Sequence, residues 1–177
     1  MGVVSTNLKP ICQAMVRNLQ SAKSSEETLG AVKVDAELVS DQGSISKIKT
    51  FTVVSDEPET SGGKNAGPSP LGYFISSIGF CQNLTFARQA ALLGLDFDAL
   101  ETTVIGRWER KGQFGIDDAE PSFREITVEM KVISKQPIER VAEVTRLTRI
   151  RCPLHTTLAK ATKVTDRLLI NGQDVAI

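Results

Sequence analysis

The chain has 177 residues, with 21 basic and 21 acidic side chains and therefore zero formal net charge. This length fits one domain of about 100–200 residues, and 41% hydrophobic with 24% charged residues is typical of a soluble globular protein. Because there is no basic excess, we expect neither nucleic acid nor an anionic membrane as a partner. No apolar run approaches the roughly 18 residues of a membrane span, and residues 1–20 lack the layout of a signal peptide, so we expect a cytoplasmic protein.

The first part of the chain predicts one helix and a β-hairpin. Residues 8–22 place Ile11, Met15 and Leu19 at helical spacing, which indicates an amphipathic helix. Residues 32–38 alternate apolar and charged side chains, which predicts a half-buried strand. After the turn residues 41–43, residues 45–54 are again extended in character, and the two segments are expected to pair.

The middle of the chain predicts a long loop followed by a long helix. Residues 55–69 are rich in Pro, Gly and Ser, and their acidic pair Asp56-Glu57 is interpreted as solvated. Ser69 and Pro70 form a helix-start signal, and the helix is expected to run over residues 70–93 until Gly94 stops it. Its first half is apolar nearly all round, which predicts a central, buried helix.

The last part of the chain predicts two strands, two helices and a final strand. The strands cover residues 100–110 and 123–133, the helices residues 137–149 and 153 to about 163, and the last strand residues 164–170 before the Asn171-Gly172 turn. Helices and strands in this order, with hairpin-like connections, predict an α+β fold with a mostly antiparallel sheet.

The three cysteines and the single histidine restrict the chemistry. An odd number of cysteines and the absence of a CxxC pair argue against a disulfide framework, and no set of four zinc ligands is visible. In the cytoplasm the cysteines are expected to be reduced thiols. Cys12 has no context that suggests reactivity and is interpreted as structural or incidental.

Cys81 and Cys152 differ in their local surroundings. Cys81 lies on the apolar stripe of the predicted central helix, where inert burial competes with a reactive role. Cys152 precedes Pro153 at a helix start and is flanked by Arg149 and Arg151. Helix amides and nearby cations lower the pKa of a cysteine, so local physics predicts Cys152 to be the more thiolate-prone of the two.

His155 follows Cys152 by three residues, which places the two on adjacent helical turns. A catalytic Cys–His pair is one interpretation. The other is a capping or solvated histidine, because a base for a cysteine normally needs a third, orienting group.

Two separate stretches of the chain resemble the OsmC/Ohr family. The stretch SDEPETSGGKNAGPSPLGYFISSIGFCQNLTFARQAALLGL is similar to that family's loop, central helix and first reactive cysteine. The stretch RLTRIRCPLHTTL is similar to the second cysteine motif, a Cys-Pro followed by Thr-Leu. The resemblance implies an OsmC-like domain over residues 31–177, preceded by a helical extension over residues 1–30.

The resemblance also implies an activity. Family members are α+β proteins that form intertwined homodimers, with a mostly antiparallel sheet around a long central helix. They reduce organic hydroperoxides without a metal or organic cofactor. By this resemblance Cys81 attacks the peroxide, Cys152 resolves the sulfenic acid as a disulfide, and a lipoylated protein or a thioredoxin-like dithiol reduces the pair.

The chain departs from the Ohr branch at the group that activates the first cysteine. In that branch an arginine does so, held by a glutamate at the start of the central helix, where this chain has Leu71. Arg17, Lys47 and Lys49 are the candidate cations, because no arginine lies between residues 22 and 88. The sequence therefore leaves open a peroxidase, a module that binds a lipophilic or electrophilic ligand at a dimer interface, and a redox sensor.

Overall fold

The computed structural model describes residues 7–161 and 164–176 of the chain. Its contacts define two compact units, one of Met1–Gln20 with Ser77–Ile177 and one of Ser21–Ser76. The longest helix, α2 (Pro70–Leu93), begins in the second unit and continues into the first.

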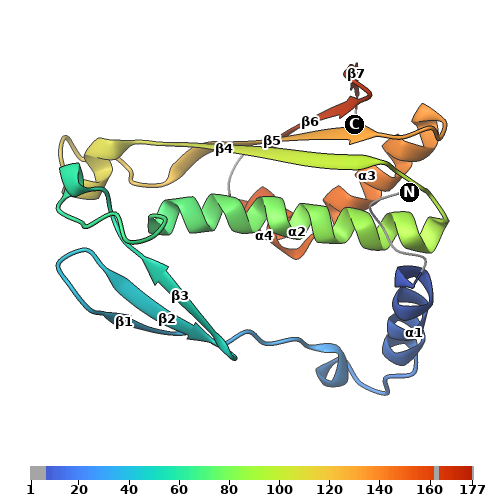
Figure 1. The fold of residues 1–177 in the computed structure, drawn as a ribbon, viewed down its shortest axis with the longest axis horizontal. Coiled ribbons are helices and arrows are strands. Elements are labelled where there is room, and N and C mark those ends of the chain that lie inside the picture. Colours follow the sequence, from blue (N-terminus) through green and yellow to red (C-terminus); the bar gives the residue numbers. More distant parts are fainter. Residues whose placement is uncertain (1–6, 162–163, 177) are drawn as a thin grey trace. The chain divides into compact units, whose positions relative to one another are not determined.

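The Ser21–Ser76 unit contains a three-stranded antiparallel sheet of order β1-β2-β3 (Figure 1). The strands are β1 (Asp35–Leu38), β2 (Ser44–Ile48) and β3 (Phe51–Ser55), with 3-10 turns η1 (Glu26–Thr28) and η2 (Glu59–Ser61) before and after them. The expected hairpin is confirmed as β1 and β2. The single extended segment over residues 45–54 was wrong, because a tight turn at Lys49, with φ of 55°, divides it. No Gly or Asn marks this turn, so the sequence gives little sign of it.

Strand β1 is exposed along its whole length, so the half-buried strand expected over residues 32–38 was also wrong. The alternation of apolar side chains is present, but Val32 and Leu38 remain exposed in the single chain. Apolar side chains at this spacing form a face that the chain does not itself cover.

The loop after β3 is organised around the carboxylate of Asp56, which is buried rather than solvated as the sequence suggested. Asp56 accepts backbone N–H groups from Glu57 at 2.9 Å, Lys64 at 2.9 Å and Ala66 at 3.2 Å. The hydrogen bond from Lys64 is the main cause that lowers the pKa of Asp56, against the opposing effect of burial. The backbone of this polar loop therefore folds around the buried Asp56 carboxylate.

The other unit contains a four-stranded sheet of order β4-β5-β6-β7. Its strands are β4 (Ala99–Trp108), β5 (Phe123–Ile133), β6 (Val164–Ile170) and β7 (Gln173–Val175). The β4–β5 and β6–β7 pairs are antiparallel, whereas β5 and β6 are parallel because helices α3 (Ile138–Arg151) and α4 (Pro153–Ala161) connect them. The predicted α+β class with mostly antiparallel strands is confirmed; β7 was not predicted.

Helix α2 packs against the β4 side of this sheet (Figure 1). A Cβ added at Gly79 would lie 3.5 Å from Val104 Cγ2, and the Thr102 hydroxyl donates to Asn83 Oδ1 at 2.6 Å. The bounds predicted for this helix are confirmed at both ends. Gly94, at φ 64°, ends it, because a left-handed residue at this position costs glycine little.

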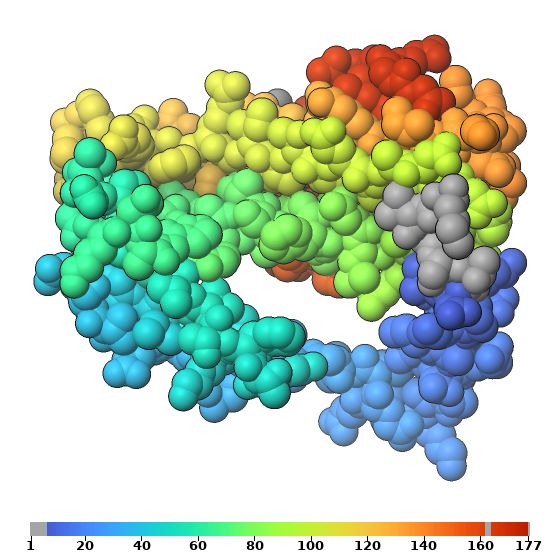
Figure 2. Space-filling model, in the orientation of Figure 1, coloured from blue at the N-terminus to red at the C-terminus, as the bar shows by residue number. Residues whose placement is uncertain are grey.

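Part of α2 is less buried than the sequence predicted. Phe80 is 71% exposed and Leu84, one turn later, is 51% exposed. Figure 2 shows atoms of this helix on the molecular surface. We call Phe80 and Leu84 the exposed α2 face; the single chain does not bury it, although its apolar character predicted burial.

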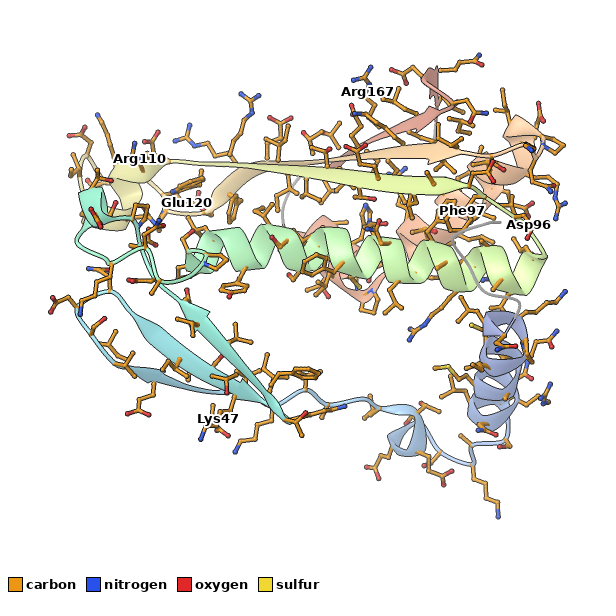
Figure 3. The ribbon with its side chains drawn as sticks, viewed as in Figure 1. Lys47, Asp96, Phe97, Arg110, Glu120 and Arg167 are labelled. Carbon is orange, nitrogen blue, oxygen red and sulfur yellow. The ribbon has the colours of Figure 1, made fainter. Side chains whose placement is uncertain are left out.

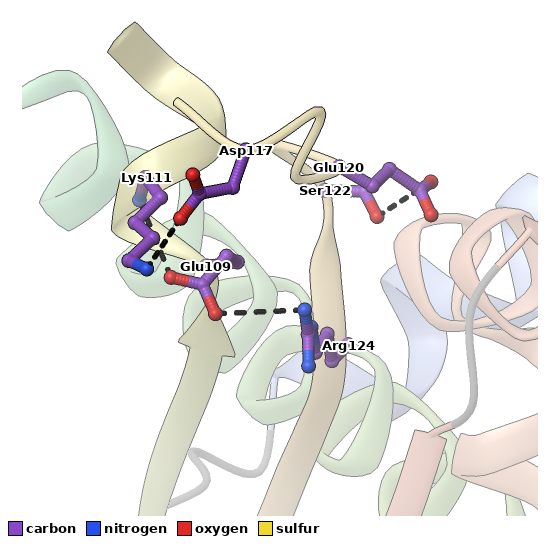
Figure 4. Close-up of polar contacts among 6 residues, drawn as sticks. All are labelled: Glu109, Lys111, Asp117, Glu120, Ser122 and Arg124. Carbon is purple, nitrogen blue, oxygen red and sulfur yellow. Dashed lines mark hydrogen bonds and ion pairs between the residues drawn. The ribbon is translucent and has the colours of Figure 1, made fainter. Parts of the chain in front are cut away.

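Surface ion pairs lie at the β4–β5 connection and across strands β5, β6 and β7. In the connection between β4 and β5, which includes η3 (Arg110–Phe114), Lys111 binds Asp117 at 2.7 Å and Arg124 binds Glu109 at 3.5 Å (Figure 4). At the β6 side, Arg167 projects from the sheet (Figure 3) and binds Asp174 and Glu129.

The N-terminal helix α1 (Leu8–Gln20) buries Cys12 and leaves Ile11, Met15 and Leu19 exposed.

Candidate active site

Cys81 and Cys152 lie side by side in the unit that holds the four-stranded sheet. Their sulfur atoms are 3.2 Å apart, although 71 residues separate the two in sequence. Cys81 projects from α2 and is half-buried, whereas Cys152 lies between α3 and α4 and is fully buried. Both are free thiols. Forming a disulfide would need the sulfurs to approach by only about 1 Å, since the S–S bond is about 2.05 Å long.

Proline fixes the backbone at Cys152. A residue before proline avoids the helical region, and Cys152 accordingly adopts an extended φ of −76° and ψ of 117°. It therefore ends α3, where its N–H donates to the Thr148 carbonyl at 2.9 Å. It also begins α4, where its carbonyl accepts the N–H of Thr156 at 3.0 Å. The backbone N–H groups of Leu154 and His155 face its sulfur.

The expectation that Cys152 is thiolate-prone was wrong. Burial is the main cause that raises the pKa of Cys152. Together with the adjacent Cys81, it brings this pKa to about 11. The N–H groups of His155 and Leu154 act in the opposite direction, as the sequence suggested, but they are weaker than the loss of solvent. At neutral pH Cys152 is therefore a protonated thiol.

The protonated state of Cys152 gives the hydrogen bond between the cysteines a direction. The Cys152 thiol donates to the sulfur of Cys81. Cys81 is the more accessible of the two residues and is therefore the better placed to meet an external electrophile.

Asp166 joins two of the residues that sequence reasoning placed near Cys152. Its Oδ2 accepts from Arg149 Nε at 3.0 Å, and its Oδ1 lies 3.1 Å from His155 Nε2. The His155 ring is thus paired with a carboxylate, while its backbone N–H faces the Cys152 sulfur. We call Arg149, His155 and Asp166 the Asp166 cluster.

Sequence reasoning missed Asp166, although a signal was present. Asp166 lies on β6 with the same parity as Leu168 and Ile170, which are buried. Alternate residues of a strand share one face, so this carboxylate points to the same side as the core. A charged residue on a core face indicates a charged partner there.

Arg17, Lys47 and Lys49 were the other predicted cations. Arg17 is exposed on α1, and no ion pair or hydrogen bond joins it to Cys81 among residues 7–161 and 164–176. Lys47 (Figure 3) is exposed on β2 and Lys49 is exposed in the following turn, and both belong to the Ser21–Ser76 unit. Arg151, beside Cys152, donates to the side chain of Gln89 on α2.

The described residues contain no group of three or more His, Cys, Asp or Glu side chains arranged to hold a metal ion. None of the helices that the structure describes combines the length and apolar character needed to cross a membrane.

Solved structures share this fold at low sequence identity. An OsmC-like protein from Mycoplasma pneumoniae is 20% identical, with a TM-score of 0.70 over 80% of this chain and 97% of that one. An organic hydroperoxide resistance protein from Elizabethkingia anophelis is 13% identical, with a TM-score of 0.64 over 85% of this chain and 100% of that one. One from Legionella pneumophila is 13% identical, with a TM-score of 0.57 over 80% and 97%. The chain therefore has the fold of these proteins.

The family is assigned from the amino-acid sequence. The family model for OsmC-like proteins matches residues 62–166, which is more than half of the chain and includes both Cys81 and Cys152. The protein belongs to the OsmC-like family. No curated protein sequence matches it.

Proposed function

We propose that the protein is a thiol-dependent peroxidase that reduces organic hydroperoxides, with Cys81 as the attacking and Cys152 as the resolving cysteine. The observation that carries the proposal is the 3.2 Å separation of the two sulfurs, with Cys152 donating to Cys81. Membership of the OsmC-like family and the fold shared with organic hydroperoxide resistance proteins support it.

The two thiols supply the two electrons that reduce the hydroperoxide to an alcohol. The Cys81 thiolate attacks the distal oxygen of the hydroperoxide, the O–O bond breaks, and the alkoxide leaves with a proton from solvent as an alcohol. Cys81 is then a sulfenic acid. The sulfur of Cys152 attacks it, the sulfenic hydroxyl leaves with the Cys152 proton as water, and a disulfide remains. A dithiol, such as a lipoylated protein or a thioredoxin-like protein in the cytoplasm, reduces this disulfide.

The polar group beside Cys81 differs in kind from the cation beside the first cysteine in the Ohr branch. Leu71 stands in place of the glutamate that orients the cation in that branch. Here the polar partner of Cys81 is the Cys152 thiol, an uncharged hydrogen-bond donor whose raised pKa keeps it protonated. This arrangement is weaker than an ion pair, so we expect slower attack than in a cation-activated site.

A homodimer is part of the proposal. The exposed α2 face, Phe80 and Leu84, is apolar, and large apolar side chains that lie together on a surface are typical of an interface. A second copy of the chain would bury this face within one turn of Cys81 on the same helix.

The deciding experiment follows consumption of cumene hydroperoxide by the purified protein with dithiothreitol as reductant. We expect turnover by the wild type and none by Cys81→Ser. Cys12→Ser is the matched control, since Cys12 is another free cysteine and contacts no other sulfur among residues 7–161 and 164–176, and it should retain full activity. Undiminished activity of Cys81→Ser would contradict the proposal. Wild-type cysteines that stay unreactive would favour the alternative, a ligand-binding module.

A further inference from the structure

We propose that Asp166 is a positioning residue for Cys152, holding together the two helices that meet at this cysteine. It binds Arg149, three residues before Cys152, and His155, three residues after it. The inference rests on the proposed function, because it assigns Asp166 to the step in which the disulfide closes.

The geometry of the Asp166 cluster spans the break between α3 and α4. Arg149 lies in the last turn of α3 and His155 in the first turn of α4. One carboxylate oxygen, Oδ2, takes the Arg149 Nε at 3.0 Å, and Oδ1 takes the His155 Nε2 at 3.1 Å. A single side chain on β6 therefore fixes both helices on either side of the extended residue Cys152.

Two of the three side chains in the Asp166 cluster are buried. The side chains of His155 and Asp166 are 5% and 8% exposed, and that of Arg149 is 41% exposed. His155 Nε2 lies within hydrogen-bond distance of both Asp166 carboxylate oxygens, at 3.1 and 3.2 Å. A buried carboxylate that loses a partner is strongly destabilising, so the three groups hold one another in place.

The link from the cluster to the sulfur runs through the backbone of α4. The N–H of His155 faces the Cys152 sulfur, and the ring of the same residue is anchored by Asp166. The hydroxyl of Thr156 donates to the Cys152 carbonyl at 3.0 Å. If His155 lost its contact with Asp166, the first turn of α4 would shift, and the backbone N–H that faces the Cys152 sulfur would shift with it.

This position matters for disulfide closure and little for attack on peroxide. Closure needs the sulfurs to approach by about 1 Å, and a misplacement of that size can slow a reaction by about 100-fold. Cys81 projects from α2, which Asp166 does not bind. Loss of Asp166 should therefore separate the two steps, leaving sulfenic acid formation unchanged while closure slows.

The test measures both steps in single-turnover reactions of wild type and Asp166→Asn with cumene hydroperoxide. Sulfenic acid is trapped with dimedone, and disulfide is counted by intact mass after alkylation. We expect closure about 10-fold or more slower in Asp166→Asn, with sulfenic acid accumulating on Cys81 as the dimedone adduct. Asp174→Asn is the control. Asp174 lies on the same sheet as Asp166 and also pairs with an arginine, but it is exposed. Sulfenic acid formation and disulfide closure in this variant should both match the wild type.

A conservative pair distinguishes positioning from general loss of structure. Gln at position 155 retains an amide N–H that can reach Asp166, whereas Leu does not. His155→Gln should close at nearly the wild-type rate and His155→Leu about 10-fold more slowly. Wild-type closure in Asp166→Asn, or equal rates in the two His155 variants, would overturn the inference.

A second oxidant separates this inference from the proposed function. Diamide accepts the two thiol hydrogens and becomes a hydrazine while the Cys81–Cys152 disulfide forms, so no peroxide is needed. If wild type ignores hydroperoxide, the proposed function fails, yet slower diamide closure in Asp166→Asn would still support the role of Asp166. Equal diamide closure rates in the two proteins would contradict it.

Discussion

The Cys152 thiol donates a hydrogen bond to Cys81 across 3.2 Å, and Cys152 is the more buried of the two residues. Burial raises the pKa of Cys152 to about 11, so the donor keeps its hydrogen at neutral pH. The same hydrogen is the one that the proposed chemistry needs when water leaves the sulfenic acid. In the proposed chemistry this one contact therefore both brings the two sulfurs together and supplies that proton.

Removal of the resolving sulfur should stop the reaction after its first step. In Cys152→Ser, Cys81 has no sulfur partner within reach, so we expect a stable sulfenic acid that reacts with dimedone. Intact mass spectrometry after one equivalent of cumene hydroperoxide would detect it. The wild type under the same conditions should give disulfide and little adduct. Equal dimedone labelling in the two proteins would remove Cys152 from the mechanism.

The raised pKa of Cys152 predicts a loss of stability at alkaline pH. The folded pKa is about 11, whereas that of an unfolded cysteine is about 8.5. The stability contributed by the protonated thiol is therefore complete below about pH 8.5 and is lost as the pH rises toward the folded pKa.

Urea unfolding of the reduced protein at about pH 8 and about pH 10.5 measures this loss. The decrease in unfolding free energy should be larger in the wild type than in Cys152→Ala, which lacks the titrating group. Identical decreases would mean that burial does not perturb this thiol.

The loop after β3 should depend on the Asp56 carboxylate. Asp56→Asn places an amide N–H₂ where a carboxylate oxygen accepts backbone N–H groups, so we expect trypsin to cleave after Lys64 about 10-fold faster. Glu59→Gln, in the same loop, should cleave like the wild type. Cleavage of Asp56→Asn at the wild-type rate would contradict this role.

The lowered pKa of Asp56 also gives this loop a pH dependence. Its contribution is complete above the ordinary carboxyl pKa of about 3.9 and is lost only as the pH falls through the lower folded value. Hydrogen exchange at the amides of Lys64 and Ala66 should therefore show protection that persists below about pH 4. Loss of protection above the ordinary value would exclude the lowered pKa.

The exposed α2 face should determine the oligomeric state. Phe80→Glu together with Leu84→Glu places two charges on this face, and like charges at a twofold contact would repel each other. Light scattering should show a dimer for the wild type and a monomer for the double variant. Phe114→Glu, an equally exposed phenylalanine in η3, serves as control and should remain dimeric. A monomeric wild type would refute the proposed homodimer.

Local signals predicted much of the fold. The helix over residues 70–93 was predicted at both ends, because Ser69 and Pro70 mark its start and Gly94 its end through backbone preferences that act within a few residues. The α+β class followed from apolar periodicity in the same way. The turn at Lys49 was missed, because its left-handed backbone is set by pairing of β2 with β3 and not by the residue type.

The sequence by itself determined the family, the two cysteine motifs and the break in the helices at Cys152-Pro153, because each depends on neighbouring residues. Only the tertiary structure decided which thiol keeps its proton and what His155 binds. Burial of Cys152 in the folded chain outweighs the neighbouring backbone N–H groups of Leu154 and His155. Asp166 meets His155 and Arg149 only because β6 returns parallel to β5 beside the two helices, a relation that no local pattern encodes.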